Sequence, residues 1–255
     1  MSAHRSQHWL AGAMLGLFNG PVFAAITVGA GSSLQFADST VDLGCSDLTI
    51  AGAANGTTAT IGAITNLNLS GSFAPGAGRI SLGGNFANTG SFVPGNSQVA
   101  IVDACGNGTG LISGATNFYD FVVATASGKQ TLFPVAAPQS IEHSLTLQGA
   151  AGHLLNIGSS APGQRGVLAV AKEAAQAIAY VSARDNNASI ARIAPGPPAQ
   201  FNSVDAGNLA NWFLAAYGDA ALVPAPALGA DRWILVAAML LAAARYLFRR
   251  ERKIS

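Results

Sequence analysis

Apolar residues alternate with small polar residues in several short segments through the middle of the chain. The clearest segments are DLTIAG with Leu48 and Ile50, NLNLSG with Leu67 and Leu69, RISLGG with Ile80 and Leu82, and QVAIV with Val99 and Ile101. A period of two predicts β-strands that bury one side and expose the other. Glycines and polar residues follow each segment, so the predicted strands are short and separated by tight turns.

These predicted strands recur at a regular interval. The sequence GSFAPG at 71–76 returns as GSFVPG at 90–95, which is 19 residues later, and 19 residues also separate Leu48 from Leu67 and Ile80 from Val99. The interval then lengthens, through FYDFVV with Phe121 and Val123 to SLTLQG with Leu145 and Leu147. A period of about 20 to 25 residues is typical of a β-solenoid, in which each coil buries its apolar side chains by stacking on the next. An all-β solenoid is therefore the expected fold, and an antiparallel β-sandwich is the alternative.

One segment gives conflicting signals. Residues 169–179 are rich in alanine and contain Lys172, Glu173 and Gln176, a composition that favours a helix. The β pattern on both sides favours a strand, a turn and a second strand. We expect the strands.

The N-terminus has the features of a secretory signal peptide at residues 1–24. A short, weakly basic start is followed by a mostly apolar stretch from Leu10 to Ala24, and Val22 and Ala24 are residues that signal peptidase accepts. Cleavage is expected after Ala24. A retained signal anchor is the alternative, but Asn19, Gly20 and Pro21 shorten the apolar run.

The C-terminus predicts a membrane segment. A linker at 219–232 precedes an apolar stretch at 233–248, WILVAAMLLAAARYLF, and a basic tail at 249–255 that begins RRERK. The positive charges place the tail in the cytoplasm and the solenoid, at 25–218, outside, in agreement with the signal peptide. A buried core helix is the alternative.

A proline-containing motif, one apolar helix and a basic end together resemble the C-terminal sorting signals of Gram-negative bacteria, the PEP-CTERM and IPTL-CTERM classes. The motif residues are Val223, Pro224, Ala225, Pro226, Ala227 and Leu228. The resemblance implies that a membrane protease removes the helix during delivery to the cell surface. Ala225 departs from the PEP pattern, which has Glu there, and Trp233 comes later than the IPTL pattern places its tryptophan.

A second resemblance covers roughly residues 41–213. Successive strand-like stretches that end in Gly207, Asn208, Trp212 and Phe213 resemble a module of large bacterial surface proteins with right-handed parallel β-helix repeats. The resemblance implies that the chain winds as a right-handed parallel β-helix. We expect Trp212 and Phe213 to cover the last coil, because an open solenoid end exposes apolar core and unpaired backbone groups.

The charge distribution argues against nucleic acid as a partner. The formal net charge is +1, but residues 25–222 contain ten acidic and six basic side chains, and most of the remaining positive charge lies in the tail. No basic stripe is present in the folded region, which argues against nucleic-acid binding.

Cys45 and Cys105 are the only two cysteines. In an exported protein a disulfide is the first hypothesis. Sixty residues correspond to about three coils, or about 14 Å along a regular solenoid, which is more than a disulfide spans. The bond therefore requires Cys45 in a cap that folds back or Cys105 in a loop, and Gly106 and Gly108 favour the loop.

The sequence contains no recognisable cofactor, metal or catalytic motif, so none is expected. His143 and His153 lack metal-ligand spacing, and His143 beside Glu142 is expected to form a solvated pair on a turn. The alternative to a structural role is a carbohydrate-active β-helix enzyme, a lyase or glycosidase. Such an enzyme would require two nearby carboxylates, for which the candidates are Asp103 and Asp120, with Lys129 or Arg79 beside them.

The sequence thus predicts a non-catalytic, adhesin-like or structural protein of the cell envelope. The expected partners are the membrane, the secretion machinery, a sorting protease and a polysaccharide or other cell-surface ligand.

Overall fold

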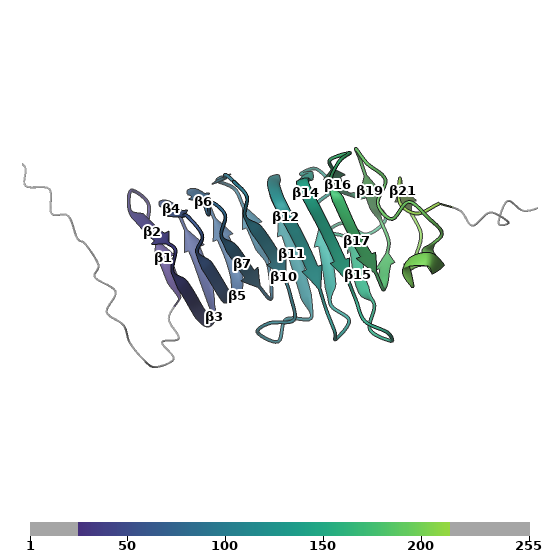
Figure 1. The fold of residues 1–255 in the computed structure, drawn as a ribbon, viewed down its shortest axis with the longest axis horizontal. Helices are drawn as coiled ribbons and strands as arrows, with labels where there is room; N and C mark the ends of the chain where they lie inside the picture. Colours follow the sequence, from purple (N-terminus) through teal and green to yellow (C-terminus); the bar gives the residue numbers. More distant parts are fainter. Residues whose placement is uncertain (1–24, 215–255) are drawn as a thin grey trace, which may run out of the picture. The chain divides into compact units, whose positions relative to one another are not determined.

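Parallel β-strands wind around a common core through residues 25–214, which are the residues that this computed structural model describes (Figure 1). Every ladder between named strands is parallel, and the chain makes about eight turns. The predicted β-solenoid is confirmed and the β-sandwich is wrong. We call one turn around the core a coil; each coil contributes strands to three faces.

Face 1 is a continuous ladder along most of the solenoid. It contains all or part of β3 (Thr40–Ile50), β5 (Thr60–Leu69), β7 (Arg79–Leu82), β10 (Gln98–Ile101), β12 (Thr116–Ala124), β14 (Gln139–Gln148) and β17 (Ala175–Ala179).

Face 2 follows face 1 in each coil. It contains the ends of β3 and β5 together with β1 (Ile26–Val28), β8 (Phe86–Asn88), β11 (Thr109–Ser113), β13 (Gln130–Phe133), β15 (Leu155–Ser159), β18 (Val181–Ala183) and β20 (Val204–Asp205).

Face 3 completes the coil in two blocks. The first block is β2 (Ser33–Ala37), β4 (Ala53–Gly56), β6 (Ser72–Ala74) and β9 (Ser91–Phe92). The second is the starts of β12 and β14 with β16 (Gly166–Val170), β19 (Asn186–Ala188) and β21 (Leu209–Ala210).

The interval at which the apolar positions repeat in the sequence equals the spacing between ladder partners in the structure. Leu48 pairs with Leu67, and Ile80 pairs with Val99, as the interval of 19 predicts. The lengthened interval also matches, because Phe121 pairs with Leu145. Repeated apolar positions therefore stack directly on one another, each coil about 4.8 Å from the next.

The core is a column of aliphatic and aromatic side chains. Phenylalanines from different coils meet edge to face, as in Phe36 with Phe73 at 6.3 Å and Phe86 with Phe118 at 5.3 Å between ring centroids. Phe118 then stacks on Phe121 at 4.6 Å. Each such side chain is fully or almost fully buried, which contributes about 1.5–3 kcal/mol per residue relative to leaving it exposed.

The alanine-rich segment forms strands, as predicted. β16 ends at Val170 and β17 begins at Ala175, with a tight turn between them in which Ala174 N donates to Ala171 O at 3.1 Å. Lys172 and Glu173 are exposed in that turn. Tertiary packing on the neighbouring coil overrides helix propensity here.

The C-terminal end of the solenoid is covered by aromatic side chains. The 3₁₀ helix η1 (Pro198–Phe201) supplies Phe201, whose ring lies 6.3 Å from that of Phe213. Trp212 is 5% exposed, bridges to Ile193 in parallel, and its Nε1 donates to Asn186 Oδ1 at 3.0 Å. Trp212 and Phe213 thus close the last coil, as expected.

Candidate functional site

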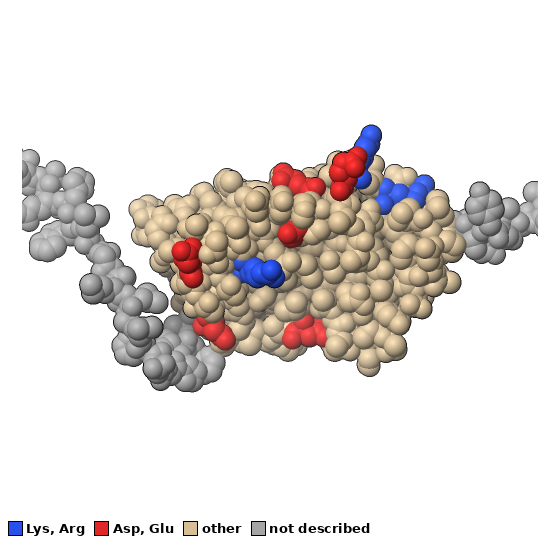
Figure 2. All heavy atoms as spheres, in the orientation of Figure 1, with Lys and Arg blue, Asp and Glu red and all other residues tan. Residues whose placement is uncertain are grey.

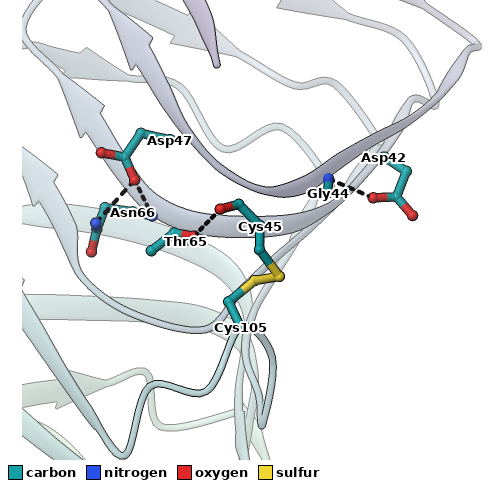
Figure 3. The surroundings of a disulfide bond; sticks show 7 residues. All are labelled: Asp42, Gly44, Cys45, Asp47, Thr65, Asn66 and Cys105. Atoms are coloured by element: carbon teal, nitrogen blue, oxygen red, sulfur yellow. Dashed lines mark hydrogen bonds between the residues drawn. A yellow bond between two sulfur atoms is a disulfide. The ribbon is translucent and has the colours of Figure 1, made fainter. Parts of the chain in front are cut away.

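Cys45 and Cys105 are joined by a disulfide at the corner between faces 1 and 2, with their Cα atoms 5.2 Å apart (Figure 3). Cys45 lies at a bulge in β3, where the ladder register shifts between Asp42 and Ser46. Gly44 and Cys45 both adopt positive φ, at 54° and 64°, and Asp42 Oδ1 holds the bulge by accepting a hydrogen bond from Gly44 N at 2.8 Å. The bulge turns the Cys45 side chain away from the core and towards Cys105.

Cys105 reaches the bulge because residues 102–108 leave the coil and fold back. A Cβ on Gly83 would lie 2.0 Å from Ala104 O, so only a glycine allows the loop to cross the preceding coil at this point. A Cβ on Gly84 would lie 3.0 Å from Asn107 Nδ2 in the same loop. The loop path shortens the distance of about 14 Å expected for three regular coils.

Asp103, in the same loop, organises the following coil. Its Oδ2 accepts hydrogen bonds from Thr125 Oγ1 at 3.0 Å, Ala126 N at 2.7 Å and Ser127 N at 3.0 Å. Desolvation alone would raise the pKa of Asp103, but these hydrogen bonds together outweigh it and hold the pKa below the ordinary value. The ionised carboxylate is therefore a structural link between coils.

Lys129 is 1% exposed, an unusual burial for a lysine. Its Nζ donates to Asn107 O, in the loop that carries Cys105. Desolvation lowers the pKa of Lys129, and the nearby Asp103 carboxylate opposes part of that effect. Lys129 thus ties its coil to the disulfide loop.

A second polar cluster lies on face 1 at a bulge in β14. The rings of Tyr119 and His143 stack with centroids 4.5 Å apart and an interplanar angle of 6°. His143 Nδ1 lies 2.7 Å from Asp120 Oδ1, which also accepts from Ser144 Oγ. Glu142 instead accepts from Asn117 Nδ2. The expected pair of Glu142 with His143 on a turn is wrong, because both lie in a strand and each bonds to the neighbouring coil.

The residues proposed for an enzyme do not converge. Asp120 pairs in register with Gln98, and Arg79 Nη1 donates to Gln98 Oε1 at 3.1 Å, so these three form a row on face 1. Asp103 lies beyond the other end of the strand Gln98–Ile101, whose length alone is about 10 Å. That separation exceeds the roughly 5–9.5 Å between the carboxylates of glycosidases. Arg79 belongs to the face 1 row with Gln98 and Asp120, whereas Lys129 directly precedes β13 on face 2.

A groove of about 580 Å³ lies on face 2, over the C-terminal coils. We call it the face 2 groove; its principal lining residues are Gln130, Leu132, Asn156, Gly158, Ser182 and Arg184. Ser160 and Pro162, in the loop at 160–165, form one rim. No motif in the sequence marks these residues as a site, although their alternation with buried positions in β13, β15 and β18 marks them as outward-facing.

Asp185 holds this rim in place. Its Oδ2 accepts from Gly163 N at 3.0 Å, and its Oδ1 accepts from Asn208 Nδ2 at 2.6 Å. Arg165 Nε in turn donates to Asn208 O at 3.1 Å. The hydrogen bonds from Asn208 and Gly163, aided by Arg184 and Arg165, hold the pKa of Asp185 below its ordinary value. Asn208 from the expected closing motif therefore braces the rim.

Charged side chains are few over the solenoid face seen in Figure 2, and most lie apart from one another. Within residues 25–214 no group of three or more His, Cys, Asp or Glu side chains is placed to hold a metal ion. In the same part of the chain, no helix has the length and apolar character needed to cross a membrane.

Several predictions fall outside the described residues. These are the signal peptide with its cleavage at Ala24, the end of the solenoid at 218, the linker, the sorting motif at 223–228, the apolar segment at 233–248 and the basic tail.

No protein-family model, curated protein or solved structure matches the chain.

Proposed function

We propose that the protein is a structural or adhesin-like component of a Gram-negative cell envelope, exported through the secretory route and without catalytic activity. Its solenoid would act outside the cytoplasm, first anchored in the inner membrane by residues 233–248 and then sorted to the surface by a protease that recognises Val223–Leu228. We further propose that the solenoid winds to the right, the hand that crossovers between parallel strands strongly favour.

The observation that carries this proposal is the disulfide between Cys45 and Cys105. Disulfides persist in oxidising compartments outside the cytoplasm and are rare in reducing ones. The bond also links two coils with two others between them, and it forms only where thiols are oxidised. It agrees with the signal peptide, which is an independent sequence feature.

The arrangement of polar side chains supports binding in preference to catalysis. Asp103 is committed to the turn at 125–127, and Asp185 to the groove rim. Both carboxylates are thereby used in holding coils and loops in place. Outward-facing polar side chains in register on face 2, such as Gln130, Asn156 and Ser182, instead suit contact with an extended partner along the solenoid.

Mass measurement of the protein from membrane and medium fractions of a Gram-negative host tests the proposal. We expect an N-terminus at Ala25, loss of the C-terminal segment in the surface or medium fraction, and no titratable thiol in the denatured, unreduced protein. A variant that starts at Ala25 after an initiator methionine is the control, and it should stay in the cytoplasm with two thiols. Full-length chain in every fraction would contradict the sorting step, and two thiols in the exported form would contradict the role of the disulfide.

A further inference from the structure

We propose that the face 2 groove binds a linear acidic polysaccharide laid along the solenoid axis, with a carboxylate of the ligand on Arg184. This inference rests on the proposed surface function and gives it a ligand class. It uses residues from four successive coils, none of which belongs to the disulfide corner.

The groove carries a row of outward-facing polar side chains in register. Gln130, Asn156 and Ser182 line it and are successive ladder partners. Beside this row, Leu132 contributes an apolar side chain next to its ladder partner Gly158. A sugar ring has an apolar C–H face and a hydroxyl edge, so a polar row beside an apolar side chain matches both surfaces of a glycan.

Gly158 creates the hollow. A Cβ at this position would lie 3.1 Å from Leu132 Cδ2, so the leucine side chain leans over space that any other residue would fill. The groove volume of about 580 Å³ falls in the range of roughly 300–1,000 Å³ that ligand sites have. The groove is therefore large enough for part of a polymer.

The groove extends along the solenoid rather than across it. Its lining passes from Gln130 through Asn156 and Ser182 to Ala206, which are positions in four successive coils. Three spacings of about 4.8 Å give about 14 Å. A single sugar would fill only part of that length, so the expected ligand is a chain whose repeating units meet successive coils.

Arg184 gives the groove its charge preference. Its Nε donates to Ala206 O at 3.2 Å, which orients the guanidinium, and no carboxylate of residues 25–214 forms an ion pair with it. The neighbouring Asp185 directs both oxygens to Gly163 and Asn208. The outer edge of the guanidinium is thus open to a ligand carboxylate, which arginine binds in a bidentate manner.

A carboxylated glycan fits better than a nucleic acid. Residues 25–214 carry nine acidic and six basic side chains, so a polymer with a charge on every unit meets a net repulsive surface. One oriented arginine beside a row of amides and hydroxyls suits a ligand with many hydroxyl groups and spaced carboxylates.

Calorimetric titration of the exported protein with a hyaluronan hexasaccharide, which carries a carboxylate on every second sugar, tests the inference, with cellohexaose as the neutral probe. We expect the hyaluronan hexasaccharide to bind at least tenfold more tightly than cellohexaose, with an affinity that falls as salt increases. Arg184→Gln should weaken binding of the hyaluronan hexasaccharide at least tenfold and leave cellohexaose binding unchanged. Arg79→Gln, which removes an exposed arginine on face 1, is the matched control and should bind as the wild type does.

Gly158→Leu fills the groove and should weaken binding of both glycans. Far-ultraviolet circular dichroism and the absence of free thiols check that this variant folds; if it does not fold, Arg184→Gln alone decides. Equal binding by wild type and Arg184→Gln, equal affinity for the two glycans, or no binding of the hyaluronan hexasaccharide would each overturn the inference. The proposed export and sorting would stand in these cases, because fractionation and mass measure them separately.

Discussion

Cys45 and Cys105 are separated by 60 residues and three ladder steps, yet their Cα atoms lie 5.2 Å apart. Cys45 lies at a β-bulge where the backbone has positive φ, and Cys105 lies in a loop that folds back towards it. The bond therefore fastens coils that otherwise touch only through their immediate neighbours.

Removing the disulfide should destabilise the solenoid substantially. Closing a loop of this length lowers the entropy of the unfolded chain, which corresponds to about 4 kcal/mol. We expect Cys45→Ser with Cys105→Ser to lower the free energy of unfolding by about 2–4 kcal/mol, measured by urea denaturation. Wild-type protein treated with a reductant should match the double variant, and an unchanged denaturation midpoint in both would contradict this role.

Gly83→Ala should displace the loop that carries Cys105. The added Cβ would lie 2.0 Å from Ala104 O, a backbone atom that moves only if the loop moves. We expect a loss of about 1–3 kcal/mol of stability and slower formation of the disulfide during oxidative refolding. Gly108→Ala is the control in the same loop, because nothing lies within 4 Å of its Cβ position. Similar behaviour of the two variants would argue against the crossing.

Lys129 should make stability depend on alkaline pH. Because burial lowers its pKa in the folded state, the unfolded chain binds more protons between that lowered pKa and the ordinary value of 10.5. Stability from this group therefore rises as pH increases through that window. Between pH 7.5 and pH 10, we expect the unfolding free energy of the wild type to rise relative to that of Lys129→Met. A difference that does not vary with pH would show that Lys129 is not desolvated.

Trp212→Ala should open the C-terminal end of the solenoid. The side chain is 5% exposed, and its loss from a packed position costs about 3–5 kcal/mol. Trp212→Phe keeps the ring but loses the hydrogen bond to Asn186, which should cost about 1 kcal/mol. Ile190→Ala, at a side chain that is 55% exposed, should change stability by less than about 0.5 kcal/mol and serves as the control in chemical denaturation.

The solenoid could be predicted because inward positions must repeat in every coil. The interval from Leu48 to Leu67 is both a sequence pattern and a ladder pair, so it is visible without a structure. The alanine-rich segment was also predictable once the neighbouring strands were given more weight than local propensity.

The site was less predictable because it depends on departures from the repeat. The spacing of residues in the sequence does not reveal the positive φ of Cys45 or the path of the Cys105 loop over Gly83. A regular coil would keep the two cysteines apart. His143 and Glu142 are adjacent in sequence but bond to Asp120 and Asn117 on the neighbouring coil. In a parallel stack, a side chain bonds to a residue about one coil away in the sequence and not to the residue next to it.

The register of 19 residues from β5 to β7 and from β7 to β10 makes the early coils interchangeable units. By stacking alone, a copy of residues 71–89 would add one complete rung and lengthen the molecule by about 4.8 Å. That copy would lie between Cys45 and Cys105, so the added rung would pull the two cysteines apart. The disulfide therefore fixes the number of rungs between its ends, and duplication of a short piece of gene can lengthen the solenoid only outside residues 45–105.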